Sequence, residues 1–129
     1  WTFSADGRLL RQENLGRLNP VPLYWEAGNV KPYAYRNRIQ RYHGPVIGSY
    51  EGDILAVADI LGDWREELIT VVPGELRIYT TTIPAADRRV TLMQDDLYRM
   101  YVAMVSMGYL YPPQPSDYLT VKTADLTGR

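Results

Sequence analysis

The sequence predicts an all-β fold with one short helix near its C-terminal end. Short apolar runs rich in β-branched residues, such as Ile54–Ala58 and Leu68–Val72, are typical of buried strands. Asp-Gly and Pro-Gly dipeptides mark tight turns beside such runs. Helical spacing of apolar residues begins only after Asp95, so one amphipathic helix is expected there.

The N-terminal residues are expected to form strands around two turns. Residues 1–10 read as a β-hairpin, because the dipeptide Asp6-Gly7 separates two short apolar runs. The prolines at 20 and 22 indicate a connection, and the alternation of Val21, Leu23 and Trp25 predicts that it ends in a short strand. Residues 27–32 form the second turn region.

A basic and aromatic segment follows at residues 33–42. Three arginines interleave with three tyrosines: Arg36, Arg38 and Arg41 with Tyr33, Tyr35 and Tyr42. Arginine binds carboxylates through two parallel hydrogen bonds, so one interpretation is a contact with a polyanion. The alternative is a solvated strand with alternating side chains. The residues alone leave both open.

From residue 54 onward the strands form one recognisable unit. The expected strands are Ile54–Ala58, Glu67–Val72, Glu75–Thr81 and Arg89–Met93. Four antiparallel strands joined by short connections are the unit of a β-propeller blade. The sequence therefore predicts a partial β-propeller of about two to three blades.

The loop between the first two of these strands is acidic. Asp59, Asp63 and Glu67 fall at its positions 1, 5 and 9, while Leu61 and Arg65 can offer backbone carbonyls. Calcium prefers six to eight oxygen ligands at roughly 2.3–2.6 Å, which a curled loop of this spacing can supply. We therefore predict a structural Ca²⁺ site at these five residues. The alternative is a charged surface turn between two strands.

The helix is expected between Asp95 and Gly108. Its apolar face follows i, i+3, i+4, i+7 spacing and consists of Tyr98, Tyr101, Val102, Val105 and Tyr109. Asp95 or Asp96 can cap the N-terminus, and Gly108 can end the helix. The Pro-Pro dipeptide that follows predicts a stiff, extended segment.

Composition excludes several classes of function. The 14 basic and 15 acidic residues give a formal charge of −1, without the basic surplus that nucleic-acid binding requires. No apolar run is long enough for a transmembrane helix. The chain has no cysteine and one histidine, which excludes thiolate metal sites and histidine clusters. A start at Trp1 without a visible signal peptide suggests a fragment.

Four motifs occur in one order along the chain: Ala58–Glu67, Leu76–Thr82, Leu92–Arg99, and Gly108-Tyr109 followed by Pro112-Pro113 and Tyr118-Leu119. Together they resemble the C-terminal end of bacterial rhamnogalacturonan lyases of polysaccharide lyase family eleven. The acidic loop also resembles the FG-GAP calcium repeat of β-propellers. The resemblance implies that residues 1–119 are the C-terminal portion of a secreted lyase's propeller domain, completed by the remaining blades, with 120–129 as a frayed tail.

The resemblance also implies a reaction. These lyases cleave pectic polysaccharide by β-elimination, in which a base removes the C5 proton of a galacturonic acid and cations neutralise its carboxylate. The expected catalytic residues are Tyr109, which precedes the Pro-Pro motif, and Lys31. The expected substrate-binding residues are Arg36, Arg38, Arg41 and Tyr111.

The chain departs from the family pattern at several positions. Gln94 and Gln114 stand where histidine is common, and Glu51 lies near a position where a lysine is expected. Loss of that lysine would remove a natural base or charge neutraliser. Two alternatives therefore remain: a carbohydrate-binding propeller without catalysis, and an adhesion or scaffold propeller that binds protein. Taken alone, the fragment is expected to be inactive.

Overall fold

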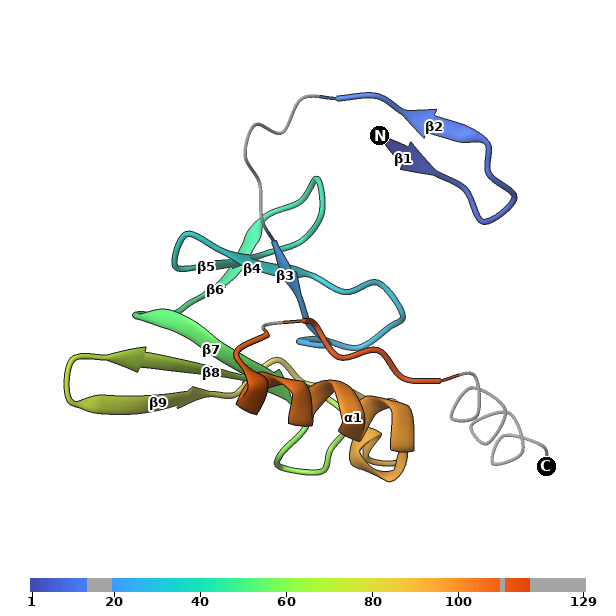
Figure 1. Ribbon diagram of the computed structural model, residues 1–129. Coiled ribbons are helices and arrows are strands. Elements are labelled where there is room, and N and C mark those ends of the chain that lie inside the picture. Colours follow the sequence, from blue (N-terminus) through green and yellow to red (C-terminus); the bar gives the residue numbers. More distant parts are fainter. Residues whose placement is uncertain (14–19, 110, 117–129) are drawn as a thin grey trace.

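The computed structural model describes residues 1–13, 20–109 and 111–116, and within them the predicted all-β fold with one short helix is confirmed. The strands of this described part form three antiparallel sheets, of two, four and three strands. Figure 1 shows the two-stranded hairpin set apart from the other two sheets, with the helix next to the three-stranded sheet. No helix among the described residues is long and apolar enough to cross a membrane.

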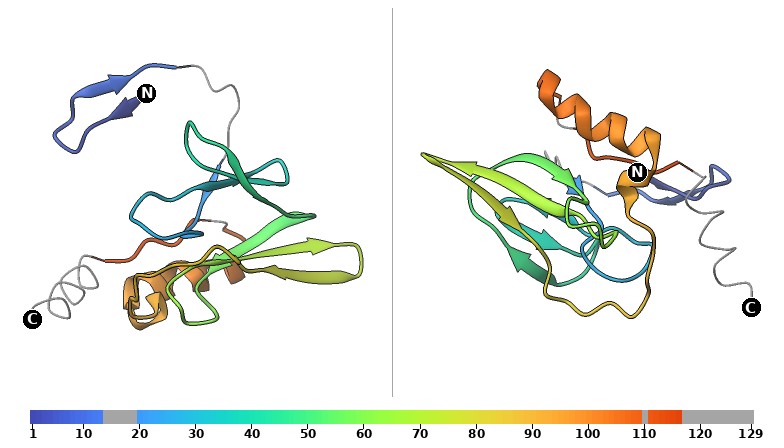
Figure 2. Two further views of the ribbon diagram at one scale, coloured as in Figure 1. Left: turned by 180° about the vertical axis from the view of Figure 1, so that it is seen from behind. Right: turned by 90° about the horizontal axis from the view of Figure 1, so that it is seen from below.

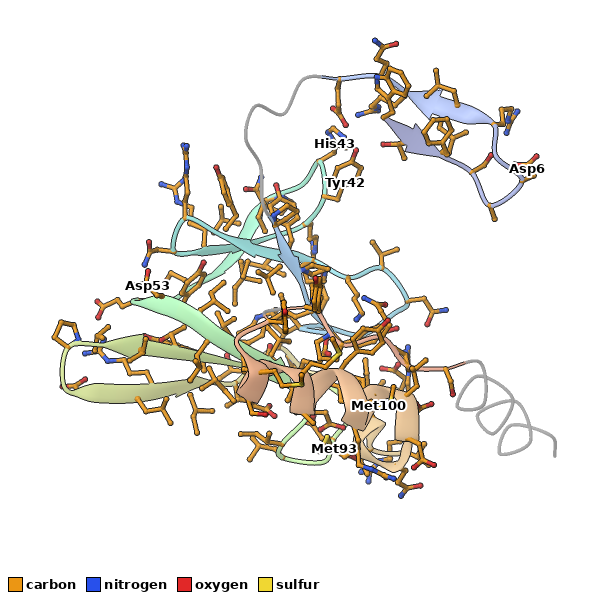
Figure 3. All side chains as sticks on the ribbon, in the orientation of Figure 1. Asp6, Tyr42, His43, Asp53, Met93 and Met100 are labelled. Carbon is orange, nitrogen blue, oxygen red and sulfur yellow. The ribbon has the colours of Figure 1, made fainter. Side chains whose placement is uncertain are left out.

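The N-terminal hairpin has the turn that the sequence predicts. Strand β1 (Thr2–Phe3) pairs with β2 (Leu9–Arg11), and Gly7 occupies the turn with a φ of 83° that glycine adopts without cost. Polar contacts join the hairpin to the loop that carries Tyr42 and His43 (Figure 3). The Tyr42 hydroxyl donates to Glu13 at 2.5 Å and lies 3.0 Å from the Thr2 hydroxyl.

The four-stranded sheet contains the basic and aromatic segment. Its strands are β3 (Val21–Pro22), β4 (Tyr33–Tyr35), β5 (Arg38–Gln40) and β6 (Val46–Ser49), paired in chain order. The β4–β5 turn places both Arg36 and Asn37 at positive φ, 47° and 63°. Two consecutive residues of this kind define the type I′ turn that suits the twist of a hairpin.

The three-stranded sheet holds most of the predicted blade. Strand β7 (Asp53–Ala58) pairs with β8 (Glu67–Val72), which pairs with β9 (Glu75–Tyr79). Gly52 precedes β7 at a φ of 89°, and an added Cβ there would lie 2.4 Å from the carbonyl oxygen of Val71. Only glycine fits this close approach of two backbones.

The prediction of a fourth strand in this blade, at Arg89–Met93, is wrong. Residues 85–91 have no regular structure, and a 3₁₀ helix, η1 (Leu92–Gln94), follows them. The physical reason is that this segment uses its donors on the acidic loop: the Thr91 hydroxyl and the Leu92 N–H both donate to Asp59 at 2.8 Å. The three strands therefore do not complete a blade within the described residues, and the propeller with its blade count stays a prediction.

The helix begins and ends at the capping residues that the sequence predicts, Asp95 and Gly108. It comprises α1 (Asp96–Met104), followed by a 3₁₀ turn, η2 (Val105–Met107). The Asp95 carboxylate accepts a hydrogen bond from the Tyr98 N–H at 2.9 Å, and Gly108 ends the helix at a φ of 84°. Figure 2 shows the helix along one side of the three-stranded sheet, where it contacts β7.

The core has two parts. The larger lies between the four-stranded and three-stranded sheets and comprises Val21, Leu23, Trp25, Ala34, Ile39, Tyr50, Val57 and Leu68. The smaller joins the acidic loop to the helix and comprises Trp64, Leu92 and Tyr98. The second part positions the candidate site, because it fixes the loop, η1 and α1 relative to one another. The predicted tail, 120–129, lies outside the described residues.

Candidate functional site

Asp59 organises the acidic loop through hydrogen bonds from four donors. Its Oδ1 accepts from the Gly62 N–H at 2.8 Å, and its Oδ2 accepts from the Trp64 N–H at 3.1 Å. The same Oδ2 accepts from the side chain of Thr91 and the N–H of Leu92. The residue is buried, so each of these bonds replaces a bond to water.

The other predicted ligands have partners within the protein too. Glu67 accepts from the N–H groups of Ile60 and Leu61 at 3.0 and 3.1 Å and from the Thr80 hydroxyl. The Asp63 carboxylate forms an ion pair with the guanidinium of Arg65, which also donates to the carbonyl of Ile83 at 2.8 Å. The loop is thus closed by donors of its own backbone together with those of Thr80, Thr91 and Leu92.

In this arrangement the three carboxylates of the loop do not form a metal-binding cluster. Among the described residues, no three side chains of His, Cys, Asp or Glu come together in a way that could hold a metal. The Asp63 carboxylate is engaged by Arg65 rather than by a shared ion. Calcium binding at Asp59, Leu61, Asp63, Arg65 and Glu67 therefore stays a prediction.

Thermal melts with calcium and with EDTA test that prediction. If calcium binds the loop, a concentration one hundred times its Kd stabilises the wild type by about 2.7 kcal/mol. Asp63→Ala, which lacks one ligand, is expected to lose this response. If neither the wild type nor Asp63→Ala melts at a different temperature in calcium than in EDTA, the calcium site is contradicted. The hydrogen-bonded loop would then explain the motif.

Glu66 is the residue of this motif that sequence reasoning missed. Its buried carboxylate accepts from the Tyr24 N–H at 2.6 Å and from the Tyr98 hydroxyl at 2.8 Å. The Tyr98 hydroxyl in turn accepts from the Asp59 N–H at 2.9 Å. Glu66 and Glu67 are both buried, so the doublet itself gives no signal of which carboxylate meets Tyr24 and Tyr98.

Lys31, a predicted catalytic residue, lies beside Glu66. Its Nζ is 3.6 Å from the Glu66 carboxylate, 4.2 Å from the centre of the Tyr24 ring, and 3.2 Å from the carbonyl oxygen of Pro113, to which it donates. Its side chain is only 13 % exposed. Burial lowers the pKa of Lys31, while the charge of Glu66 raises it in opposition.

Tyr109 and Tyr111 form the aromatic feature of the site. Their rings stack with centroids 5.8 Å apart and planes 16° apart, and the residues are 51 % and 49 % exposed. The helical spacing predicts that Tyr109 belongs to the apolar face of the helix, but Gly108 ends the helix before it. The left-handed turn at Gly108 instead directs Tyr109 into the extended segment, where its ring meets that of Tyr111.

The three arginines lie on the four-stranded sheet. Arg36 and Arg38 are exposed at the β4–β5 turn, and the guanidinium of Arg36 lies 5.1 Å from the centre of the Tyr35 ring. Arg41 forms a two-pronged ion pair with Glu26, at 2.7 and 2.6 Å. Its charge is therefore already matched, which leaves Arg36 and Arg38 as the stronger candidates for binding an anion.

Arg41 also lines a small cavity. Its volume is about 260 Å³, and Glu26, Asn29, Pro32 and Tyr42 contribute to its wall. The predicted site residues therefore fall into separate groups. Lys31, in the β3–β4 connection, is joined to the segment of Tyr109 and Tyr111 through Pro113, whereas Arg36 and Arg38 lie at the β4–β5 turn. Glu51 forms an ion pair with Arg77 on β9.

Comparisons with known proteins agree with this arrangement of motifs. A model of the family described as "Rhamnogalacturonan lyase family 11, C-terminal domain" matches residues 49–127. The rhamnogalacturonan endolyase YesW of Bacillus subtilis is 50 % identical over 64 residues, 48 % of this chain and 10 % of that protein. The exolyase YesX of the same species is 42 % identical over 71 residues, 54 % of this chain and 12 % of that protein.

A solved structure agrees as well. The crystal structure of rhamnogalacturonan lyase YesW superposes with a TM-score of 0.73 at 31 % identity. The superposition covers 88 % of this chain and 22 % of that one, so the chain spans only a minor part of the length of these relatives. The matched region contains the acidic loop, α1 and the Tyr109–Tyr111 segment, and the chain belongs to rhamnogalacturonan lyase family 11 through the C-terminal domain of that family.

Proposed function

We propose that this chain is the C-terminal part of a lyase that cleaves rhamnogalacturonan, a pectic polysaccharide, by β-elimination. The exposed Tyr109–Tyr111 pair carries the proposal. A tyrosine side chain combines an apolar ring with a polar hydroxyl. The flat face of such a ring can pack against the C–H face of a sugar ring. The two Bacillus relatives, named as an endolyase and an exolyase of rhamnogalacturonan, support the same substrate class.

Tyr109 is the better candidate for the base of the reaction. In β-elimination the base takes the C5 proton, a double bond forms between C4 and C5, and the bond from C4 to its oxygen breaks. Tyr109 is half-exposed, whereas Lys31 is held in an ion pair and largely buried. We therefore assign Tyr109 to proton transfer and Tyr111 to sugar binding, with Arg36 and Arg38 available to the galacturonate carboxylates.

The test combines binding with product formation. The 129-residue chain is incubated with rhamnogalacturonan, with homogalacturonan as the control polymer, while ultraviolet absorbance follows the C4–C5 double bond. We expect binding to rhamnogalacturonan without product. A longer family lyase that carries residues 49–127 of this chain as its C-terminal domain is expected to form product, and Tyr109→Phe to abolish it. Failure of the chain to bind either polymer would contradict the proposal.

A carbohydrate-binding domain without catalysis is the second candidate. The ion pair of Glu51 with Arg77 favours it, because an acid occupies the region where the resemblance leads us to expect a lysine. Under this alternative the chain binds rhamnogalacturonan, but the longer lyase that carries it forms no product. The two candidates thus differ in one measurement on the same protein.

A further inference from the structure

The segment that carries the aromatic pair has no regular structure of its own. Residues 111–116 belong to no helix or strand, and Gly108 separates them from α1. Pro112 and Pro113 also lack backbone N–H donors, so this segment has fewer ways to bond to the fold. The near-parallel stacking of Tyr109 and Tyr111 therefore depends on contacts from elsewhere in the chain.

Two side chains supply such contacts. Lys31 donates to the carbonyl oxygen of Pro113 at 3.2 Å, and the Pro113 side chain is fully buried. Asp95 accepts from the Ser116 N–H at 3.0 Å and from the Ser116 hydroxyl. The extended segment is thus held near its middle and at its end, just beyond the exposed rings.

Both of these side chains are held in place in turn. Glu66 and the ring of Tyr24 fix the ammonium group of Lys31, and Glu66 also binds the helix through Tyr98. Asp95 caps α1 through the Tyr98 N–H, so the same helix fixes the second contact. Through Tyr98, the buried cluster under the acidic loop is linked to the position of the aromatic pair.

We propose that Lys31 and Asp95 are positioning residues, which hold the Tyr109–Tyr111 pair in the stacked geometry that binds a sugar residue of rhamnogalacturonan. This inference rests on the proposed function for its ligand. It gives Lys31 a role other than that of a base. Releasing the segment means that about one residue must be ordered again on binding, which corresponds to about a tenfold weaker Kd.

The experiment uses the full chain with Lys31→Met, Lys31→Arg and Tyr111→Leu, alone and combined, at a temperature where far-ultraviolet circular dichroism shows all of them folded. Near-ultraviolet circular dichroism reports the stacked tyrosines, and calorimetry with a rhamnogalacturonan oligosaccharide gives Kd. We expect Lys31→Met to remove the dichroism signal that Tyr111→Leu removes and to weaken binding about tenfold. Lys31→Arg, which keeps a donor, is expected to restore both.

The double variant separates positioning from general destabilisation. In the Tyr111→Leu background, Lys31→Met is expected to change neither the dichroism nor Kd further, since the pair is already lost. Independent, additive effects would overturn the proposal, as would an unchanged dichroism signal in Lys31→Met. If Lys31→Met does not fold, Ser116→Ala tests the second contact by the same readouts. A wild type without affinity for the oligosaccharide would refute the proposed function, while the dichroism result would still decide the positioning role.

Discussion

Replacing Glu66 by alanine is expected to destabilise the fold by about 3–5 kcal/mol, because a buried ion pair that loses one partner leaves the other charge uncompensated. The Lys31 side chain, which is only 13 % exposed, would be left without its counter-ion. The Tyr24 N–H and the Tyr98 hydroxyl lose their acceptor as well. Urea unfolding followed by circular dichroism measures the change.

The matched control is Glu75→Ala. Glu75 pairs with Arg77 on the exposed strand β9, where an ion pair is expected to contribute less than about 1 kcal/mol. Equal destabilisation by the two substitutions would show that the Glu66 cluster does not hold the fold together.

The pH dependence of stability offers a second check on Glu66. Burial raises the pKa of Glu66 above its ordinary value, although the charge of Lys31 and the bonds from Tyr24 and Tyr98 act against this. Between the ordinary and the raised pKa, the folded state keeps a proton that the unfolded chain has released. Stability is therefore expected to fall as pH rises through this window, and Glu66→Gln is expected to remove that part of the pH dependence.

Replacing Asp59 by alanine is expected to cost about 2–6 kcal/mol, since two buried donors, the N–H groups of Trp64 and Leu92, each lose an acceptor at about 1–3 kcal/mol. The less buried donors, the Gly62 N–H and the Thr91 hydroxyl, also lose their bonds to Asp59 but can turn to water. Loss of the hydrogen bonds from Thr91 and Leu92 would separate the loop from the segment that leads into α1. Equilibrium unfolding in the presence of EDTA gives this cost without any contribution from calcium.

Asp63→Ala in the same buffer is the control for Asp59. Asp63 belongs to the same loop, but its side chain is 43 % exposed and its ion pair is with its neighbour Arg65. We expect a change below about 1 kcal/mol. Similar costs at the two positions would contradict the view that hydrogen bonds to Asp59, rather than the net acidity of the loop, close it.

Features that depend on neighbouring residues in the chain could be predicted from the sequence. The hairpin turn at Gly7, the strands β7, β8 and β9, and the helix between its Asp95 cap and Gly108 all follow from turn chemistry, alternation and capping. These signals are local because each reflects the backbone preferences of a few consecutive residues. The ordered motifs also indicated the family correctly.

Tertiary structure alone decided which polar groups meet. Arg89–Met93 has an apolar pattern that suits a strand, but its donors bind Asp59, a partner 32 residues away, so no strand forms. Lys31 is predicted as a catalytic residue, yet it is buried against Glu66 and Pro113, positions far from it in sequence. Tyr109 leaves the helix face and stacks on Tyr111. A sequence shows which groups can form hydrogen bonds. Which partner each group takes depends on long-range packing, because packing removes water and each buried polar group then bonds to another group of the protein.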